Sequence, residues 1–77
     1  MMNATQLALG KRARIVELQG GRQMVGKLEA MGMVVGSTVF KKSASPLHGP
    51  IVLERGAVAV AIGFGLARKV IVEPLGP

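Results

Sequence analysis

The segment from Lys27 to Gly36 limits the fold more than any other, because a helix must end and a strand must follow within a few residues. It reads KLEAMGMVVG. Its first half contains helix formers and places the apolar Leu28 and Met31 on one face. Gly32 then supplies the left-handed backbone conformation that ends a helix at little cost. Since β-rich sequence begins soon afterwards, we predict one short helix, roughly Met24–Met31, inserted between strands.

Most of the remaining chain has the pattern of short strands separated by turn residues. Val16–Leu18 breaks the alternation of the first strand, which indicates either a bulge or burial on both faces. Gly63–Ala67 is typical of a bend or a single helical turn. Short, closely spaced strands predict a mainly β fold, a small antiparallel barrel of about five strands with one inserted short α-helix. The predicted strands are Arg12–Leu18, Thr38–Lys42, Ile51–Glu54, Ala57–Ile62 and Val70–Val72.

The length and composition favour a single small domain. With 77 residues, the chain is near the lower size limit for a domain that folds without metals or disulfides, and we expect residues 1–77 to form one domain. The chain has no cysteine, which excludes disulfide and thiolate chemistry. The longest uncharged run, Gly56–Ala67, is too short for a bilayer span of about 20 residues. No signal-peptide pattern is visible, so we expect a cytoplasmic protein without membrane insertion.

The charge is strongly one-sided. Ten Lys and Arg oppose four acidic residues, giving a net charge of +6. A balance of this kind is typical either of a domain with an acidic partner or of solvated charge that keeps an apolar domain in solution. Single-strand nucleic-acid binders use aromatic stacking platforms, but this chain has only two Phe and no Tyr or Trp. We therefore expect no nucleic-acid partner.

No catalytic or nucleotide-binding constellation is apparent. Gly21–Lys27 nearly matches the phosphate-binding loop pattern, but Leu28 stands where a Ser or Thr would ligate Mg²⁺. General acid–base catalysis uses a positioned His or paired carboxylates, whereas the chain has one His and scattered Glu residues. We predict that the protein is not an enzyme and that it has no catalytic residue and no nucleotide cofactor.

His48 is the candidate metal ligand. A first-row transition metal generally needs three or more side-chain ligands, so one His without Cys or Asp makes a poor site within one chain. A divalent metal shared between two copies through His48 and a Glu stays open. We expect no cofactor, with weak divalent metal binding as the alternative.

The chain resembles the FeoA family, the small cytosolic component of bacterial ferrous iron transport. The most specific matching parts are the helix with its exit glycines, Gly32 and Gly36, and the loop Pro46–Pro50 before the third strand. The resemblance extends over Thr5–Glu73. Further matching residues are Leu9, Gly10, Ala13, Ile15, Lys27, Leu28, Met31, Ile51, Val60, Ala61, Ala67, Val70 and Val72.

Two positions depart from the family pattern. The family usually has Arg-Leu where this chain has Lys27-Leu28. It often has Gly-Asp-Pro where this chain has His48-Gly49-Pro50, so the loop lacks a carboxylate.

The resemblance implies an SH3-like barrel that docks, as an accessory module, on the cytosolic part of an FeoB-type GTPase-permease. The same barrel resembles the C-terminal domain of iron-dependent repressors of the DtxR type. The competing hypothesis is a transition-metal-binding or metal-sensing domain that dimerises around a metal, and self-association stays open in either case. The candidate partner-binding residues lie on the outer side of the helix, at its exit and in the Pro-rich loop. They are Lys27, Glu29, Met33, Pro46, Leu47 and His48.

Overall fold

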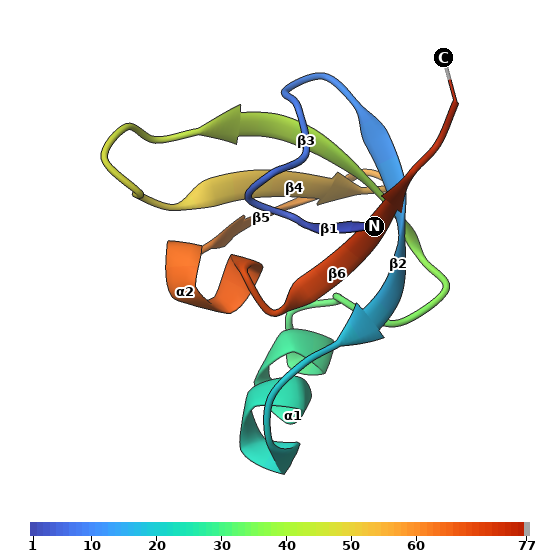
Figure 1. The fold of residues 1–77 in the computed structure, drawn as a ribbon, viewed down its shortest axis with the longest axis vertical. Coiled ribbons are helices and arrows are strands. Elements are labelled where there is room, and N and C mark those ends of the chain that lie inside the picture. Colours follow the sequence, from blue (N-terminus) through green and yellow to red (C-terminus); the bar gives the residue numbers. More distant parts are fainter. Residues whose placement is uncertain (77) are drawn as a thin grey trace.

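Six strands, most of them with alternating apolar residues, build one antiparallel sheet, which the computed structural model describes for residues 1–76 (Figure 1). The strands follow each other across the sheet in the order β1-β6-β2-β3-β4-β5. Helix α1 lies at one end of the molecule, and α2 is a single short turn before the last strand. The elements are β1 (Met2–Asn3), β2 (Arg12–Leu18), α1 (Arg22–Ala30), β3 (Thr38–Ala44), β4 (Ile51–Arg55), β5 (Val58–Ile62), α2 (Phe64–Ala67) and β6 (Val70–Pro74).

The mainly β architecture with an inserted helix is confirmed, with one additional strand. Strand β1 pairs antiparallel with β6, Met2 facing Val72 and Asn3 facing Ile71. Two residues are too few to show an alternating pattern, which is why β1 escapes prediction from the sequence. Among the described residues, β1 and β5 end the sheet on opposite sides and do not pair, so the small SH3-like sheet is curved but not closed. The predicted single domain ends at Pro77, which lies outside the described residues.

The core forms where the inner faces of the strands meet Leu28 of α1. In β2 the alternation is as predicted, since Ala13 and Ile15 are buried while Arg12 and Arg14 are exposed. The register between β2 and β6 shifts after Ile15, so the irregular half of this strand is a bulge. The buried apolar residues are Ala4, Leu7, Ala13, Ile15, Leu28, Met33, Val39, Ile51, Leu53, Ile62, Ala67, Val70 and Val72.

Helix α1 ends in the way that the glycine pattern predicts. Gly32 has a φ of +88° and lies just beyond the last helical turn. Its N–H donates to the carbonyl of Glu29 at 2.9 Å, and the N–H of Met33 donates to the carbonyl of Leu28 at 3.0 Å. These two bonds form a Schellman motif, and the accompanying apolar contact comes from Leu28 and Met33, which are both fully buried.

The other end of α1 begins earlier than predicted. The helix starts at Arg22 rather than near Met24, with Gly21 as its N-cap and no side-chain capping hydrogen bond. Gly21 can cap a helix but is equally typical of a turn, so it marks the start of α1 less clearly than Ser, Asp or Asn would. Strands β3 and β6 likewise run to Ala44 and Pro74, past their predicted ends.

No helix within residues 1–76 has the length and apolar character needed to cross a membrane.

Candidate functional site

The hairpin between β3 and β4 ends in a turn with an unusual backbone. Leu47 and His48 have φ values of 57° and 59°, in the left-handed region that few residues other than glycine adopt. The N–H of Gly49 donates to the carbonyl of Pro46 at 3.2 Å across these two residues. Positive φ at both central positions is the pattern of a type I′ turn, for which Asn-Gly is the favoured sequence. A Leu-His pair in this turn costs about 1–2 kcal/mol per residue.

Two contacts hold this hairpin tip, which we define as residues 45–50. The N–H of Ser45 donates to the carbonyl of Pro50 at 2.9 Å and closes the base of the tip. The His48 ring stacks on Phe64, the first residue of α2, with ring centroids 4.4 Å apart and planes 16° from parallel. Figure 1 shows the tip projecting from the sheet on the side where α2 lies. As a result, Leu47 stands 98% exposed at the end of a supported turn.

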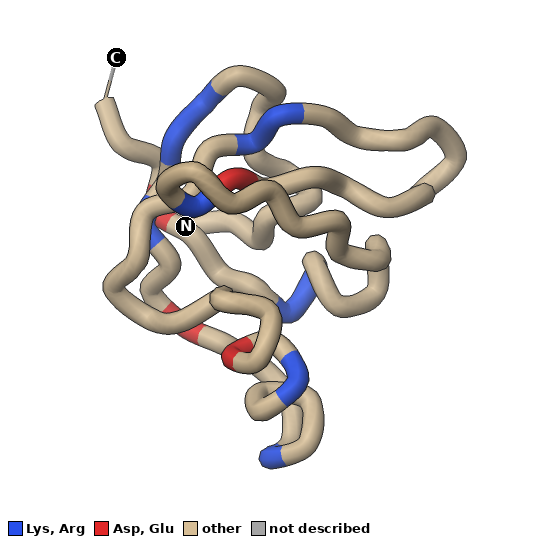
Figure 2. Tube along the Cα trace, turned by 180° about the vertical axis from the view of Figure 1, so that it is seen from behind, with Lys and Arg blue, Asp and Glu red and all other residues tan. Residues whose placement is uncertain are grey.

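The predicted residues on α1 form a second, separate surface. Lys27 and Glu29 are both exposed on the helix. Figures 1 and 2 place α1 at one end of the longest axis, away from the hairpin tip. The structure therefore does not bring the helix residues together with Pro46, Leu47 and His48.

Met33 does not belong to either surface. Its side chain is completely buried in the core, where it contacts the end of α1 through the Schellman motif. The prediction of Met33 as a partner-contact residue is wrong because the reversal of the chain at Gly32 turns the next side chain inward.

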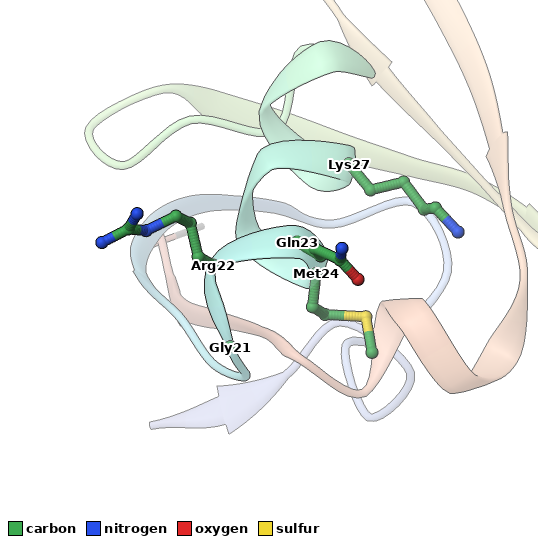
Figure 3. A pocket seen from close by; sticks show the side chains of 5 residues that line it. All are labelled: Gly21, Arg22, Gln23, Met24 and Lys27. Atoms are coloured by element: carbon green, nitrogen blue, oxygen red, sulfur yellow. The ribbon is translucent and has the colours of Figure 1, made fainter.

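A pocket of about 610 Å³ lies at the start of α1 (Figure 3). Its lining residues belong to the segment that nearly matches a phosphate-binding loop. Figure 3 shows Arg22 and Lys27 pointing to opposite sides, so the two cations do not converge on one ligand. Leu28 is fully buried in the core, so the position that would ligate Mg²⁺ in such a loop faces away from the pocket. This geometry does not fit nucleotide binding. The lining residues are Gly21, Arg22, Gln23, Met24 and Lys27.

Charged residues are spread along the backbone trace rather than gathered at one centre (Figure 2). Arg14 pairs with Glu73 at 3.4 Å and Lys42 with Glu54 at 3.6 Å, both on the outer side of the sheet. Within residues 1–76, no group of three or more His, Cys, Asp or Glu side chains lies close enough to hold a metal ion. The observed partner of His48 is the Phe64 ring.

Lys41 has a structural role that the sequence analysis missed. Its side chain is only 3% exposed, and its Nζ donates to the carbonyls of Ala4 and Thr5 at 3.0 and 2.9 Å. Burial lowers the pKa of Lys41. Lys41 shares the inner face of β3 with buried Val39, but a charged residue ordinarily indicates solvent, so the alternation alone did not point to a buried lysine. Phe64 was also missed, because no local pattern reveals a stacking partner in a distant loop.

The family comparison identifies an FeoA domain over residues 2–74. The crystal structure of an iron uptake regulatory protein (FeoA) is 32% identical, with a TM-score of 0.87 and 96% of each chain covered. The solution structure of iron(II) transport protein A from Clostridium thermocellum is 30% identical, with a TM-score of 0.88. It covers 96% of this chain and 46% of that one. A search among curated proteins found no match.

Metal-dependent regulators share the fold at lower identity. The structure of ScaR with bound Cd²⁺ is 15% identical, with a TM-score of 0.86, and this chain covers 35% of it. That likeness concerns the fold alone. The family match spans nearly the whole chain, and so the protein belongs to the FeoA domain family, small accessory domains with a role in ferrous iron transport.

Proposed function

We propose that this protein is an accessory interaction module of ferrous iron uptake that docks on the cytosolic part of an FeoB-type GTPase-permease. The observation that supports this proposal best is the hairpin tip, where a strained turn holds Leu47 98% exposed. Family membership supports the transport role. Because the proposed docking site lies on the cytosolic part of the permease, we propose that this protein acts in the cytoplasm. We also propose that it needs no cofactor to dock.

The strain at the tip supports a binding role. Two left-handed L-residues together cost about 2–4 kcal/mol, which persists only where surrounding contacts determine the conformation. Here the backbone hydrogen bond from Ser45 to Pro50 and the stacking of His48 on Phe64 supply those contacts. Strain of this kind is concentrated at clamps and binding sites rather than in ordinary surface loops.

A rigid, exposed Leu is an efficient anchor. Transfer of its side chain into an apolar pocket of a partner stabilises the complex by about 1.5–3 kcal/mol. Since the turn is already ordered, little conformational entropy is lost on binding. The expected partner feature is therefore an apolar pocket that accepts Leu47, on a surface whose acidic character suits the net charge of +6.

The direct test compares Leu47→Asn with Leu9→Asn in binding to the isolated cytosolic part of the permease. Asn adopts the left-handed conformation more readily than Leu, so Leu47→Asn should keep the turn while removing the apolar anchor. Leu9 is 59% exposed and lies outside the tip, which makes it a matched control. We expect Leu47→Asn to weaken binding at least about tenfold and Leu9→Asn to leave it unchanged. Equal binding by the two variants would remove the tip from the interface.

The helix surface needs a separate test. The double variant Lys27→Glu with Glu29→Lys exchanges two exposed charges on α1 and keeps the net charge at +6. Weaker binding by this variant would show that α1 also contacts the partner. Unchanged binding would remove Lys27 and Glu29 from the interface.

A further inference from the structure

Strand β5 is an open sheet edge that lacks the usual protection against strand pairing. It ends the sheet beyond β4, and its sequence Val-Ala-Val-Ala-Ile contains no charge and no Pro. The pairing between β4 and β5 shows no register shift, whereas the β2–β6 and β3–β4 ladders are both irregular. Natural proteins usually block such an edge with lysine, proline or a bulge. The opposite edge, β1, is only two residues long.

The hairpin geometry identifies the backbone groups that face this edge. A two-residue loop with Gly56 at a φ of +60° joins Arg55 to its partner Val58. The two residues that flank such a turn are hydrogen-bonded to each other. Along an antiparallel pair of strands, hydrogen-bonded residue pairs then alternate with pairs that are not hydrogen-bonded. This alternation directs the N–H and C=O groups of Ala59 and Ala61 away from β4. Both residues are exposed, so their backbone groups are open to a further strand.

A pocket of about 370 Å³ lies beside the same edge. Met31, Val58 and Val60 give it apolar walls, and Val58 is 62% exposed. The guanidinium of Arg55 lies at the pocket, where its Nη1 donates to the carbonyl of Gly32 at 3.2 Å. Among residues 1–76, no carboxylate lies within ion-pair distance of this guanidinium.

We propose that β5 accepts an extended, acidic segment of another protein as a seventh antiparallel strand. Backbone hydrogen bonds at Ala59 and Ala61 would supply affinity, as in other cases of strand addition. Side chains of the added strand on the inner face would lie next to Val58 and Val60 and enter the pocket. Alternating apolar and acidic residues fit this arrangement, with the apolar ones in the pocket and a carboxylate at Arg55. The proposal is independent of the hairpin-tip contact, and either can fail without the other.

Charge favours an acidic segment over a second copy of this chain. Two copies joined along β5 would bring together two bodies that each carry +6. An acidic strand instead lowers the total charge and supplies Arg55 with a carboxylate partner.

The test uses an end-capped peptide in which valine and glutamate alternate. It has about seven residues, which is a usual strand length. Amide chemical shifts of the whole protein report its binding. We expect changes concentrated at Ala59, Ala61 and Arg55, with a dissociation constant below about 1 mM. A peptide that alternates valine and lysine should cause no such changes.

Two matched charge variants separate the pocket from general electrostatics. Arg55→Glu and Arg22→Glu lower the net charge equally, but only Arg55 lies at the pocket. We expect Arg55→Glu to weaken the binding of the acidic peptide at least about tenfold, and Arg22→Glu to weaken it by less than about threefold. Ala61→Pro removes one N–H at the edge, and it should weaken binding while circular dichroism shows an intact fold.

Four results would overturn the proposal. The first is that no amide chemical shift changes at about 1 mM acidic peptide, and the second is that the lysine peptide binds as well as the acidic one. The third is that the two charge variants weaken binding of the acidic peptide equally. The fourth is that, without peptide, the chemical shifts of β5 depend on protein concentration. The last result would assign the edge to a second copy of the chain.

Discussion

Replacing Gly32 with Ala should destabilise the protein for two separable reasons. At a φ of +88°, an L-residue costs about 1–2 kcal/mol more than glycine. A Cβ at this position would also lie 3.1 Å from Nη1 of Arg55. That guanidinium ends a flexible side chain and can move away, but the movement weakens its 3.2 Å hydrogen bond to the Gly32 carbonyl. Such an exposed bond contributes about 0.5–1 kcal/mol, so we expect a total loss of about 1.5–3 kcal/mol.

Urea unfolding of three Gly→Ala variants distinguishes these contributions. Gly36 has a φ of +96° and no atom within 4 Å of an added Cβ, so Gly36→Ala should show the conformational cost alone, about 1–2 kcal/mol. Gly26 lies inside α1 with free space around it, so Gly26→Ala should stabilise the protein by about 0.5–1 kcal/mol. In a domain of this size, each kcal/mol shifts Tm by about 4–8 °C. A Gly32→Ala variant as stable as the parent would refute this explanation of how α1 ends.

Four further predictions concern Lys41, Phe64 and His48. Lys41→Met should lower the free energy of unfolding by about 1–3 kcal/mol in urea, because it leaves the carbonyls of Ala4 and Thr5 unpaired. Burial lowers the pKa of Lys41 from its ordinary 10.5, so the unfolded chain binds more protons between the two pKa values. Stability should therefore rise with pH across that window, and the rise should be absent in Lys41→Met. Phe64→Ala removes the ring that supports His48, so amide exchange in the tip should become faster while the core stays protected. Finally, equilibrium titration with Fe²⁺ should give no binding tighter than millimolar, equally for the parent and His48→Ala. Tight binding lost in His48→Ala would favour the metal-binding hypothesis instead.

Features of the fold were predictable where the residues that determine them lie close together in the sequence. The end of α1 was predictable because one glycine, two apolar neighbours and the hydrogen-bond geometry of the last turn lie within a few residues. An irregularity in β2 was predictable because the alternation stops at Val16, but the sequence left a bulge and burial on both faces as alternatives, and the register shift against β6 identifies the bulge. Strand β1 was not, since its pairing with β6 depends on residues at the other end of the chain.

The candidate site was predictable only in part. The prolines and glycine marked the loop between β3 and β4, but not the left-handed backbone of Leu47 and His48, which no common turn preference indicates. The inward position of Lys41 was hidden because a charged residue ordinarily indicates solvent, and its carbonyl partners come from the start of the chain. The open edge at β5 required the strand order of the whole sheet.

Chemical-shift mapping with the cytosolic part of an FeoB-type permease tests the proposed docking most directly. The labelled chain is titrated with that partner, and the backbone amide signals of the non-proline residues are followed. We predict the largest changes at residues 45–49 of the hairpin tip, centred on exposed Leu47, and their loss in Leu47→Asn. Binding that shifts other surfaces while the tip signals stay unchanged would contradict docking through this turn.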